Sequence, residues 1–244
     1  MTKRQNVRKA MVIISFLLFP VVIFYFSPYL IVMGAIEGIA AGSFIMFGLQ
    51  FVLSIFLGRS LCGYVCPVGG LQECLILASN KKTKGGRMNL IKYFIWTPWI
   101  IAFAAFFIRA GGVKDVDFFF FISHGVSLSE TYSYFIYYGI LLLVVILNIT
   151  VGKRAFCHCV CWMAPFMVIG TQMSTWLKIP RLHLRASKDS CSGCGLCSKK
   201  CPMSLEVKEM VETNKMSNTE CILCGECADA CPKKVITYSL HRGY

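Results

Sequence analysis

Long apolar runs separated by short basic segments occupy the first three quarters of this 244-residue chain. A helix that crosses a bilayer needs about 17 to 25 mostly apolar residues. Four runs meet that length. The first is expected to remain as an uncleaved helix, because it is longer than the apolar core of a signal peptide and no cleavage site follows it promptly. We therefore expect four transmembrane helices, over residues 10–34, 39–57, 90–108 and 134–151.

Two shorter apolar segments, residues 68–78 and 162–177, follow the second and fourth runs. The first is too brief to span, and the second is broken by Pro165 and Gly170, so we expect both to be interfacial or re-entrant. Each comes after a basic end and a Cys-x3-Cys pair. The chain thus contains a weak internal repeat of two spans, a basic end, a cysteine pair and an interfacial segment. The pairs are Cys62 with Cys66 and Cys157 with Cys161.

Loop charge sets the expected orientation of these spans. The N-terminal tail and residues 81–87 are basic, whereas residues 109–133 carry nearly balanced charge. Short cytoplasmic loops are enriched in Lys and Arg. We therefore expect both termini and the 81–87 loop in the cytoplasm and residues 109–133 outside. This predicts a multi-pass protein of the inner (cytoplasmic) membrane.

After the last apolar segment the motif Cys-x2-Cys-x2-Cys-x3-Cys-Pro occurs twice. In such a motif three closely spaced thiolates bind one iron-sulfur cube, and the fourth, before the proline, reaches the cube of the other half. Four-cysteine zinc sites use two separated Cys-x2-Cys pairs instead, so zinc is disfavoured. The eight cysteines are Cys191, Cys194, Cys197, Cys201, Cys221, Cys224, Cys227 and Cys231.

This segment resembles the bacterial-type ferredoxin with two [4Fe-4S] clusters, over about residues 188–238. The resemblance implies a small α+β ferredoxin domain that carries electrons. It also implies which cysteines bind which cluster. One cluster takes Cys191, Cys194, Cys197 and Cys231, and the other takes Cys221, Cys224, Cys227 and Cys201.

The composition is that of a membrane protein. Hydrophobic residues make up 56% of the chain and charged residues only 15%, and the mean hydropathy is +0.63, which excludes an ordinary soluble protein. Thiolate ligands must stay reduced, so the cluster motifs are expected to face the cytoplasm. The formal charge of +13 gathers in short basic segments, as the positive-inside bias of membrane proteins requires, and we expect no nucleic-acid partner.

The two Cys-x3-Cys pairs are a less specific signal. Pro67 pushes the residue before it away from helical geometry, which ends a helix at Cys66 and turns the thiols toward one point. One interpretation treats these cysteines as small packing residues. Their recurrence favours a shared iron or iron-sulfur site. The expected ligands are Cys62, Cys66, Cys157 and Cys161, with Cys159 and Cys74 as spare candidates, and His158 is expected to be an interfacial residue.

The whole chain resembles the membrane ferredoxin subunit of periplasmic nitrate reductase systems and the related membrane flavoprotein of nitrous oxide reductase systems, a polyferredoxin-like family. The matching segments are residues 58–69, residues 152–161 and the two ferredoxin motifs. The resemblance implies four spans, both ends in the cytoplasm, and electron movement between cytoplasmic clusters and a membrane or exported partner. The sequence departs from it after the second cysteine pair, which is followed by Trp162, whereas the first pair is followed by a proline. It also lacks a flavin-attachment pattern, so a flavin would belong to a partner chain.

We therefore predict two domains. Residues 1–180 form a membrane all-α domain with four transmembrane helices in two pseudo-repeats, and residues 181–244 form the ferredoxin domain. The predicted function is electron transfer through two [4Fe-4S] clusters and a third metal site, as a subunit of an oxidoreductase complex without a catalytic residue of its own. The expected partners are the lipid membrane and redox proteins on the cytoplasmic side and in or across the membrane.

Two alternative functions remain open. The chain could supply electrons for maturation of an exported metalloenzyme or for reducing a metal ion. It could also react with a quinone, which needs ionisable groups as proton partners. The candidates near the predicted outer face are Glu37, Asp115, Asp117 and His124.

Overall fold

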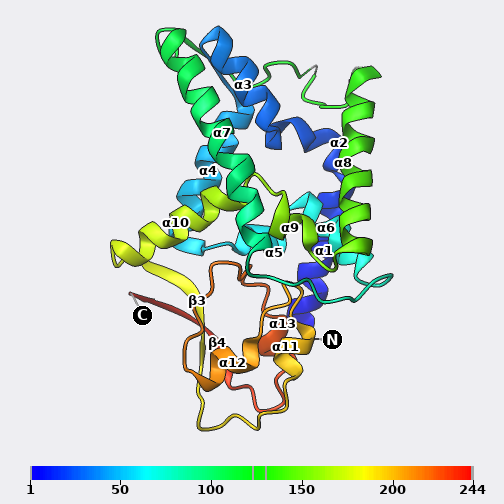
Figure 1. The fold of residues 1–244 in the computed structure, drawn as a ribbon, viewed down its shortest axis with the longest axis vertical. Helices are drawn as coiled ribbons and strands as arrows, with labels where there is room; N and C mark the ends of the chain where they lie inside the picture. The colour runs from blue at the N-terminus through cyan, green and yellow to red at the C-terminus, as the bar shows by residue number, and fades with distance from the viewer. Residues whose placement is uncertain (1, 123, 130, 243–244) are drawn as a thin grey trace.

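The computed structural model describes residues 2–122, 124–129 and 131–242. Figure 1 shows a helical part at the top and a smaller part, which contains two strands, at the bottom. The first helix, α1 (Lys3–Leu17), begins beside the lower part and runs up into the helical part. The two ends of the chain therefore lie in the same half of the molecule (Figure 1).

Two helices are long and apolar enough to cross a membrane. They are α7 (Met88–Arg109) and α8 (Thr131–Thr150), and they correspond to the runs predicted at residues 90–108 and 134–151. Only 6% of the most apolar window of α7 and 17% of that of α8 is buried. An apolar helix that is exposed on most sides suits a lipid environment.

The first apolar run is broken rather than continuous. After α1 the chain bends by 58° into α2 (Phe19–Val22) and the 3-10 helix η1 (Ile23–Phe26), and a separate helix, α3 (Pro28–Glu37), follows. Pro20 lies in the first turn of α2, and Pro28 begins α3. Proline fits the first turn of a helix but disrupts its interior. The single helix predicted over residues 10–34 is therefore corrected to three helical pieces.

The second run forms α4 (Gly42–Leu57), an apolar helix of 16 residues. It is shorter than most helices that span a bilayer. The part of the chain that the structure describes therefore contains two candidate spans, or three if α1 and the bent piece after it form one span. The predicted number of four is not reached on length and composition alone.

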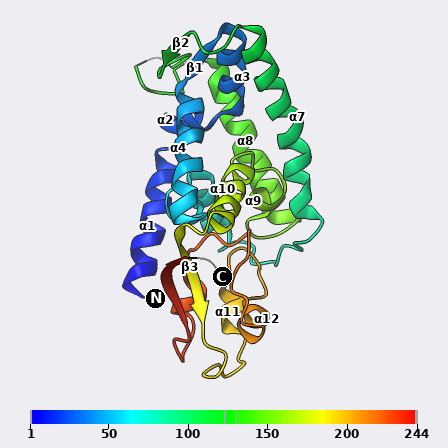
Figure 2. The same ribbon diagram turned by 90° about the vertical axis from the view of Figure 1, so that its left-hand side faces the viewer.

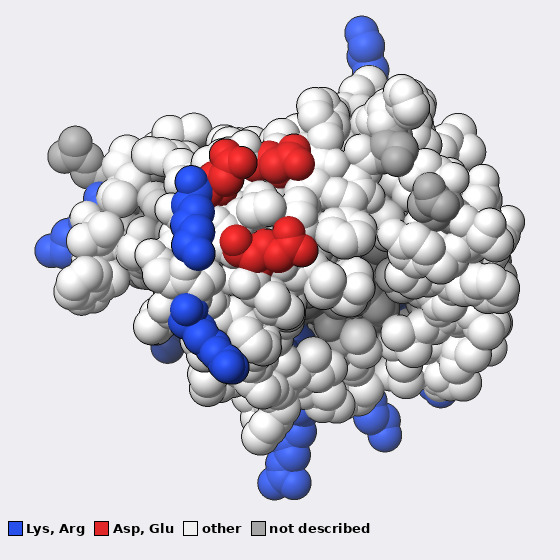
Figure 3. Space-filling view, turned by 90° about the horizontal axis from the view of Figure 1, so that it is seen from above, with Lys and Arg blue, Asp and Glu red and all other residues white. Residues whose placement is uncertain are grey.

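A small two-stranded parallel sheet lies at the end of the helical part that is away from the smaller part. It pairs β1 (Ile39–Ala41) with β2 (Asp115–Asp117), with Ile39 opposite Asp115. Viewed from this end, carboxylates gather in one area of the surface (Figure 3). The exposed acidic residues of these segments are Glu37, Asp115 and Asp117.

The two cysteine pairs lie on matching pairs of short helices. The first repeat has α5 (Ser60–Tyr64) and α6 (Pro67–Leu75), and the second has α9 (Ala155–Cys159) and α10 (Ala164–Trp176). The bounds of α5 and α9 differ by 95 positions at both ends. The segments predicted to be interfacial or re-entrant are thus short helices, too short to cross a bilayer.

The smaller part has the α+β character expected of a ferredoxin. Strand β3 (Pro180–Ala186) pairs antiparallel with β4 (Ile236–Arg242). Between them lie α11 (Leu196–Lys200), α12 (Val207–Glu212) and α13 (Glu226–Asp229). Its core includes Met203, Val207, Val211, Ile222 and Ile236, together with several of the motif cysteines. Figure 1 shows the N-terminus beside α13, and Arg4 of α1 pairs with Asp229 of α13 at 3.0 Å, whereas Figure 2 shows the two strands side by side.

Candidate functional site

The second ferredoxin motif encloses a cavity lined by thiols. Cys221, Cys224 and Cys227 line it, and Cys201, which caps the end of α11 in the first motif, lines it too. These are the four residues that the resemblance assigns to one cluster. The fold therefore brings the last cysteine of the first motif to the three closely spaced cysteines of the second.

The surroundings of this cavity fit an iron-sulfur cluster. Burial raises the pKa of Cys201 and Cys221 to about 11 and the pKa of Cys224 to about 12. Free thiols in such a place stay protonated at neutral pH, whereas iron binds the thiolate. A bound cluster provides the positive charge that four buried thiolates need, which is how metal binding is coupled to deprotonation.

The first ferredoxin motif lies closer to the surface. Cys194 is exposed, and its pKa is lowered, chiefly by a hydrogen bond from the Leu196 backbone. Cys191, Cys197 and Cys231 are half-buried and pack against the same core. A cluster at this motif would therefore be the one closer to solvent and to a protein that docks from outside.

The Cys-x3-Cys pairs of the two repeats meet. Cys62 lies in α5 and Cys157 lies in α9. Cys66 and Cys161 are each the second residue after the end of these helices. Burial raises the pKa of the Cys66 thiol, and the Cys62, Cys157 and Cys161 thiols raise it further, so all four lie within electrostatic reach of one another. Cys66, Cys157 and Cys161 line one cavity of about 240 Å³, whose other walls are mostly apolar.

An approximate two-fold relation links the repeats at these thiols. Gln72 of α6 and Met167 of α10 are 95 positions apart, as are Cys62 and Cys157. Nε2 of Gln72 lies 3.2 Å from Sγ of Cys157, and Sδ of Met167 lies 3.2 Å from Sγ of Cys62. Each repeat therefore places a side chain of its second helix against the first thiol of the other repeat.

One buried ion-pair network connects the four-thiol site to the ferredoxin part. Arg59 Nη1 lies 2.9 Å from Glu220 Oε2, and Lys92 Nζ lies 2.5 Å from Glu220 Oε1. Arg59 Nη1 also donates to the Thr219 carbonyl, at 2.8 Å. Burial opposes ionisation of Glu220, but Arg59 and Lys92 outweigh it and lower the pKa of this carboxyl. Two cations thus share one carboxylate next to Cys221.

A second buried network also lies next to the four thiols, where Arg154 Nη1 donates to the Cys62 carbonyl. Arg8 Nη2 lies 2.7 Å from Glu73 Oε1, and Arg154 Nη2 lies 2.8 Å from Glu73 Oε2. Burial opposes ionisation of Glu73, but Arg154 and Arg8 outweigh it and lower the pKa of this carboxyl to about 2. Arg8 also reaches Glu226 of α13, at 3.0 Å. This network joins α1, α6 and α9 to the ferredoxin part.

The four-thiol site and the second ferredoxin motif are in direct contact. A Cβ added at Gly63, between Cys62 and Cys66, would lie 2.5 Å from the Ile222 carbonyl oxygen and 3.5 Å from Cα of Cys224. Only glycine permits an approach this close. Gln5 of α1 holds the same turn, because its Nε2 donates to the Cys224 carbonyl at 3.0 Å.

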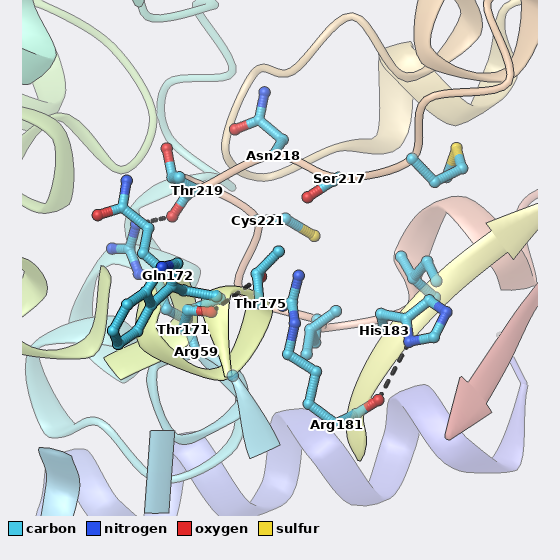
Figure 4. Close-up of a pocket in the computed structure, with 15 residues that line it drawn as sticks. Arg59, Thr171, Gln172, Thr175, Arg181, His183, Ser217, Asn218, Thr219 and Cys221 are labelled. Atoms are coloured by element: carbon cyan, nitrogen blue, oxygen red, sulfur yellow. Dashed lines mark hydrogen bonds between the residues drawn. The ribbon is translucent and has the colours of Figure 1, made fainter. Parts of the chain in front are cut away.

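A cavity of about 420 Å³ opens where the ferredoxin part meets the end of α10. Figure 4 shows Cys221 on its wall, between Ser217 and Asn218 on one side and Thr175 on the other. Arg59 lines the same cavity, and among the described residues that line it none is acidic. Cys221 of the second motif therefore lines an open cavity, next to a buried cation.

The other predicted candidates lie apart or have different roles. Cys74 is exposed and Cys159 is buried in α9. His158 is 1% exposed, with Nδ1 2.6 Å from Asn89 Oδ1 and Nε2 3.2 Å from the Met203 carbonyl, so its interfacial assignment is corrected to a buried contact between the two parts. Trp162 follows Cys161, at the position where Pro67 follows Cys66 in the first pair. Its Nε1 donates to the Phe26 carbonyl at 2.9 Å.

Several residues of the site were not singled out from the sequence. They are Gln72 and Met167, which touch the thiols, and Arg8, Glu73, Lys92 and Glu220 of the ion-pair networks. Equivalent positions of the two repeats are 95 residues apart, and this spacing identifies Gln72 and Met167 as equivalent residues. No local pattern marks Glu73 or Glu220, because their partners are distant in the chain.

Among the described residues, no three His, Cys, Asp or Glu side chains are arranged to hold one metal ion. In a mononuclear site every sulfur lies at bonding distance from the same atom, about 2.3 Å for zinc, whereas in a [4Fe-4S] cluster each thiolate binds a separate iron.

Comparison with known proteins gives matches in both parts of the chain. A family model described as a 4Fe-4S binding domain matches residues 39–85 and again residues 134–180, two segments whose bounds also differ by 95. A model described as a 4Fe-4S dicluster domain matches residues 183–233. The first match covers the two copies of the internal repeat, and the second covers the ferredoxin part.

Two curated proteins are similar to most of this chain. The "Putative electron transport protein YccM" of Escherichia coli is 23% identical over 80% of this chain, which spans 55% of that protein's length. An uncharacterized protein of Methanocaldococcus jannaschii is 26% identical over 78% of this chain and 68% of its own length. No solved structure matches. The comparisons support an iron-sulfur electron-transfer family for this chain, with 4Fe-4S binding domains in both of its parts.

Proposed function

We propose that this chain is an integral membrane protein that conducts electrons between cytoplasmic [4Fe-4S] clusters and a membrane or exported redox partner. Two clusters would be held by the ferredoxin cysteines, in the crossed arrangement given above, and a third by Cys62, Cys66, Cys157 and Cys161. When bound, clusters of this kind supply one-electron redox chemistry. The chain's own residues hold the clusters, keep water from them and fix their order.

The contact between Gly63 and Ile222 carries this proposal. It puts the backbone between Cys62 and Cys66 directly against the turn that bears Cys224. Cys194 of the first motif, in contrast, is exposed. The three cysteine sets therefore suit a relay that runs from a surface station, through a buried one, to the four-thiol site among the membrane helices.

We further propose the orientation expected from loop charge. The ferredoxin part and both termini face the cytoplasm, and the β1–β2 end faces outward. The basic loop at 81–87 supports this orientation, as does the need of cluster thiols for a reducing compartment. The cytoplasmic partner is then a soluble redox protein, and the acceptor or donor on the far side is a membrane or exported protein.

Metal analysis of the anaerobically purified protein tests the relay. We expect more iron and more acid-labile sulfide than two [4Fe-4S] clusters contain, and a third redox signal. Cys62→Ala and Cys157→Ala should each abolish that signal and leave the two ferredoxin signals intact. If both variants keep the parent iron content and electron transfer to the membrane, the four thiols are packing residues and the third station does not exist.

A second candidate function, quinone reaction, has a specific observation in its favour. The apolar cavity of about 240 Å³ beside Cys66, Cys157 and Cys161 lies among α2, α3 and α8, and it is the kind of site that takes an apolar ring. The carboxylates named earlier for proton exchange lie at the β1–β2 end instead (Figure 3). Oxidation of a soluble quinol by the purified protein, lost on Ile140→Trp, would favour this function over transfer to a protein.

A further inference from the structure

The two repeats place one arginine each beside the four thiols. Arg59 and Arg154 are 95 positions apart, and each lies three residues before the first cysteine of its pair. Their side chains are 2% and 0% exposed. A guanidinium is charged at any physiological pH and is costly to bury without a counter-charge. Two such groups at equivalent positions therefore indicate something anionic between them.

The protein supplies only part of that counter-charge. Arg59 shares Glu220 with Lys92, and Arg154 shares Glu73 with Arg8. Each buried carboxylate therefore serves two buried cations. Glu226 adds a third carboxylate, but it contacts Arg8 and Lys9, on the side of the second network away from Arg154. Positive charge remains next to the thiols on both sides.

Each arginine also has a donor left over. Among the described residues, the Nε atoms of both Arg59 and Arg154 are buried without a hydrogen-bond partner. A buried donor that is left unpaired is destabilising, and more so when the group is charged. The same omission at two equivalent positions indicates a common missing acceptor.

The position of these charges identifies the acceptor. The Arg59 carbonyl accepts from the Cys62 N–H at 3.1 Å, and a Cβ added at Gly69 would lie 2.9 Å from Arg154 Nη1 and 3.4 Å from Cβ of Cys66, so both arginines lie next to the thiols. Arg154 Nη1 also donates to the Cys62 carbonyl at 3.3 Å. The unsatisfied donors, the excess positive charge and the four thiols thus occur in one place.

We propose that the four thiols hold an anionic, sulfide-bridged iron cluster and that Arg59 and Arg154 are its positioning residues, one from each repeat, which donate Nε–H to its sulfur atoms. This inference rests on the proposed third station and specifies its chemical class. A sulfide-bridged cluster with four thiolates carries net negative charge and offers many sulfur acceptors, whereas a single iron ion offers only the four thiolates. One-electron reduction adds negative charge, so the two arginines favour the reduced state and raise the reduction potential.

Substitution of each arginine tests this role. Arg59→Gln and Arg154→Gln remove the charge, and Arg59→Lys and Arg154→Lys keep it but lose the Nε–H donor. The readouts are iron and acid-labile sulfide per chain and the midpoint potential of the third signal, with the two ferredoxin signals in the same sample as a check on folding. The matched control is Arg87→Gln, which removes an exposed arginine outside both networks.

We expect parent protein to contain extra sulfide as well as extra iron. Each Gln variant should lower the ratio of reduced to oxidised third site at a fixed ambient potential by about tenfold, which is about 59 mV for a one-electron couple. The Lys variants should fall between Gln and parent, and Arg87→Gln should not differ from parent. A second outcome also supports the proposal. In it, a Gln variant loses the extra iron and sulfide but keeps both ferredoxin signals, and the corresponding Lys variant has an intermediate potential.

Three results overturn it, and they are distinguishable from failure of the relay. Extra iron without extra sulfide means a single ion, which leaves a third station but removes the cluster. Extra iron and sulfide with an unchanged potential in the Gln variants means that the arginines do not act on it. Iron and sulfide no higher than two clusters require removes the third station itself, and with it the proposed relay.

Discussion

The Nη2 atom of Arg8 and the Oε1 atom of Glu73 lie 2.7 Å apart, and their side chains are 0% and 9% exposed. This ion pair joins the first helix of the chain to the second short helix of the first repeat. Glu73 also accepts from Arg154, and Arg8 also donates to Glu226. One carboxylate thus holds together three helices that surround the four-thiol site.

We expect Glu73→Gln to destabilise the protein by about 3 to 5 kcal/mol, because removal of one member of a buried ion pair leaves the other charge unpaired. Two arginines lose their partner here. The measurement is thermal unfolding in detergent. Glu206→Gln is the matched control: the Glu206–Lys82 pair also links the two parts of the molecule but is 58% and 51% exposed, so its loss should cost at most about 1 kcal/mol. Equal losses for the two variants would contradict this reading of Glu73.

The same pair predicts a dependence on pH. The pKa of Glu73 is lowered from 4.5 to about 2, so the folded protein binds its proton less tightly than the unfolded chain does. The stability that Glu73 contributes is therefore fully present above pH 4.5 and is lost as the pH falls toward 2. The difference in melting temperature between parent and Glu73→Gln should be constant from pH 8 to pH 5 and should begin to narrow below about pH 4.5. A difference that narrows already between pH 8 and pH 6 would show that another group is responsible.

Gly63→Ala is expected to separate the four-thiol site from the ferredoxin part. The added methyl would lie 2.5 Å from the Ile222 carbonyl, and neither backbone can yield without moving a cysteine. We expect slower reduction of the third signal by the pre-reduced ferredoxin clusters, with both ferredoxin signals retained. Gly48→Ala is the control, because an added Cβ there meets nothing within 4 Å and alanine suits a helix better than glycine does. An unchanged rate in Gly63→Ala would place the electron path elsewhere.

The crossed ligand sets can be tested by spectroscopy. Cys201 lines the cavity of the second motif, so Cys201→Ser and Cys224→Ser should perturb one and the same electron paramagnetic resonance signal and spare the other. Cys194→Ser should instead perturb the other ferredoxin signal and spare the one that Cys201→Ser and Cys224→Ser affect. If Cys201→Ser and Cys194→Ser affect the same cluster, the ligands are not crossed.

The proposed orientation can be tested with reporter fusions. A reporter that is active only after export should be active when fused after Gly112, next to the exposed segment Asp115–Asp117. It should be inactive at the C-terminus, where a cytoplasmic reporter should work. Ser127 is a poorer fusion point, because its hydroxyl bonds the Val21 carbonyl and the Phe24 N–H. The reverse pattern of activities would invert the orientation and remove the cytoplasmic partner.

Local signals in the sequence were sufficient for much of this architecture. The eight ferredoxin cysteines lie in two copies of one motif, which is visible from spacing alone, and the resemblance to a ferredoxin implied which of them bind which cluster. The long apolar helices α7 and α8 were also predictable from their length and hydropathy, although α7 contains Pro98. The internal repeat was visible because Cys62 and Cys66 recur as Cys157 and Cys161.

The sequence was less informative where distant residues decide the outcome. Pro20 and Pro28 look alike in a hydrophobic run, and only packing decided that they begin new helices. Glu73 and Glu220 resemble ordinary polar residues, yet each is buried between two cations supplied by other segments. His158 seemed to belong at a membrane surface, and its contact with Met203 depends on where the ferredoxin part docks.

The attachment of α1 to the ferredoxin part sets the order in which the molecule can be completed. Gln5 and its partner Asp229 are 224 positions apart, and Arg8 and its partner Glu226 are 218 apart. The N-terminal end leaves the ribosome first. Loops this long close late, because closing them costs conformational entropy before the stabilising contacts form. The polar residues of α1 therefore remain hydrated until almost all of the chain has been synthesised. Iron loading of the proposed four-thiol site would therefore follow the synthesis of the segment that carries Glu226 and Asp229 and its docking on α1.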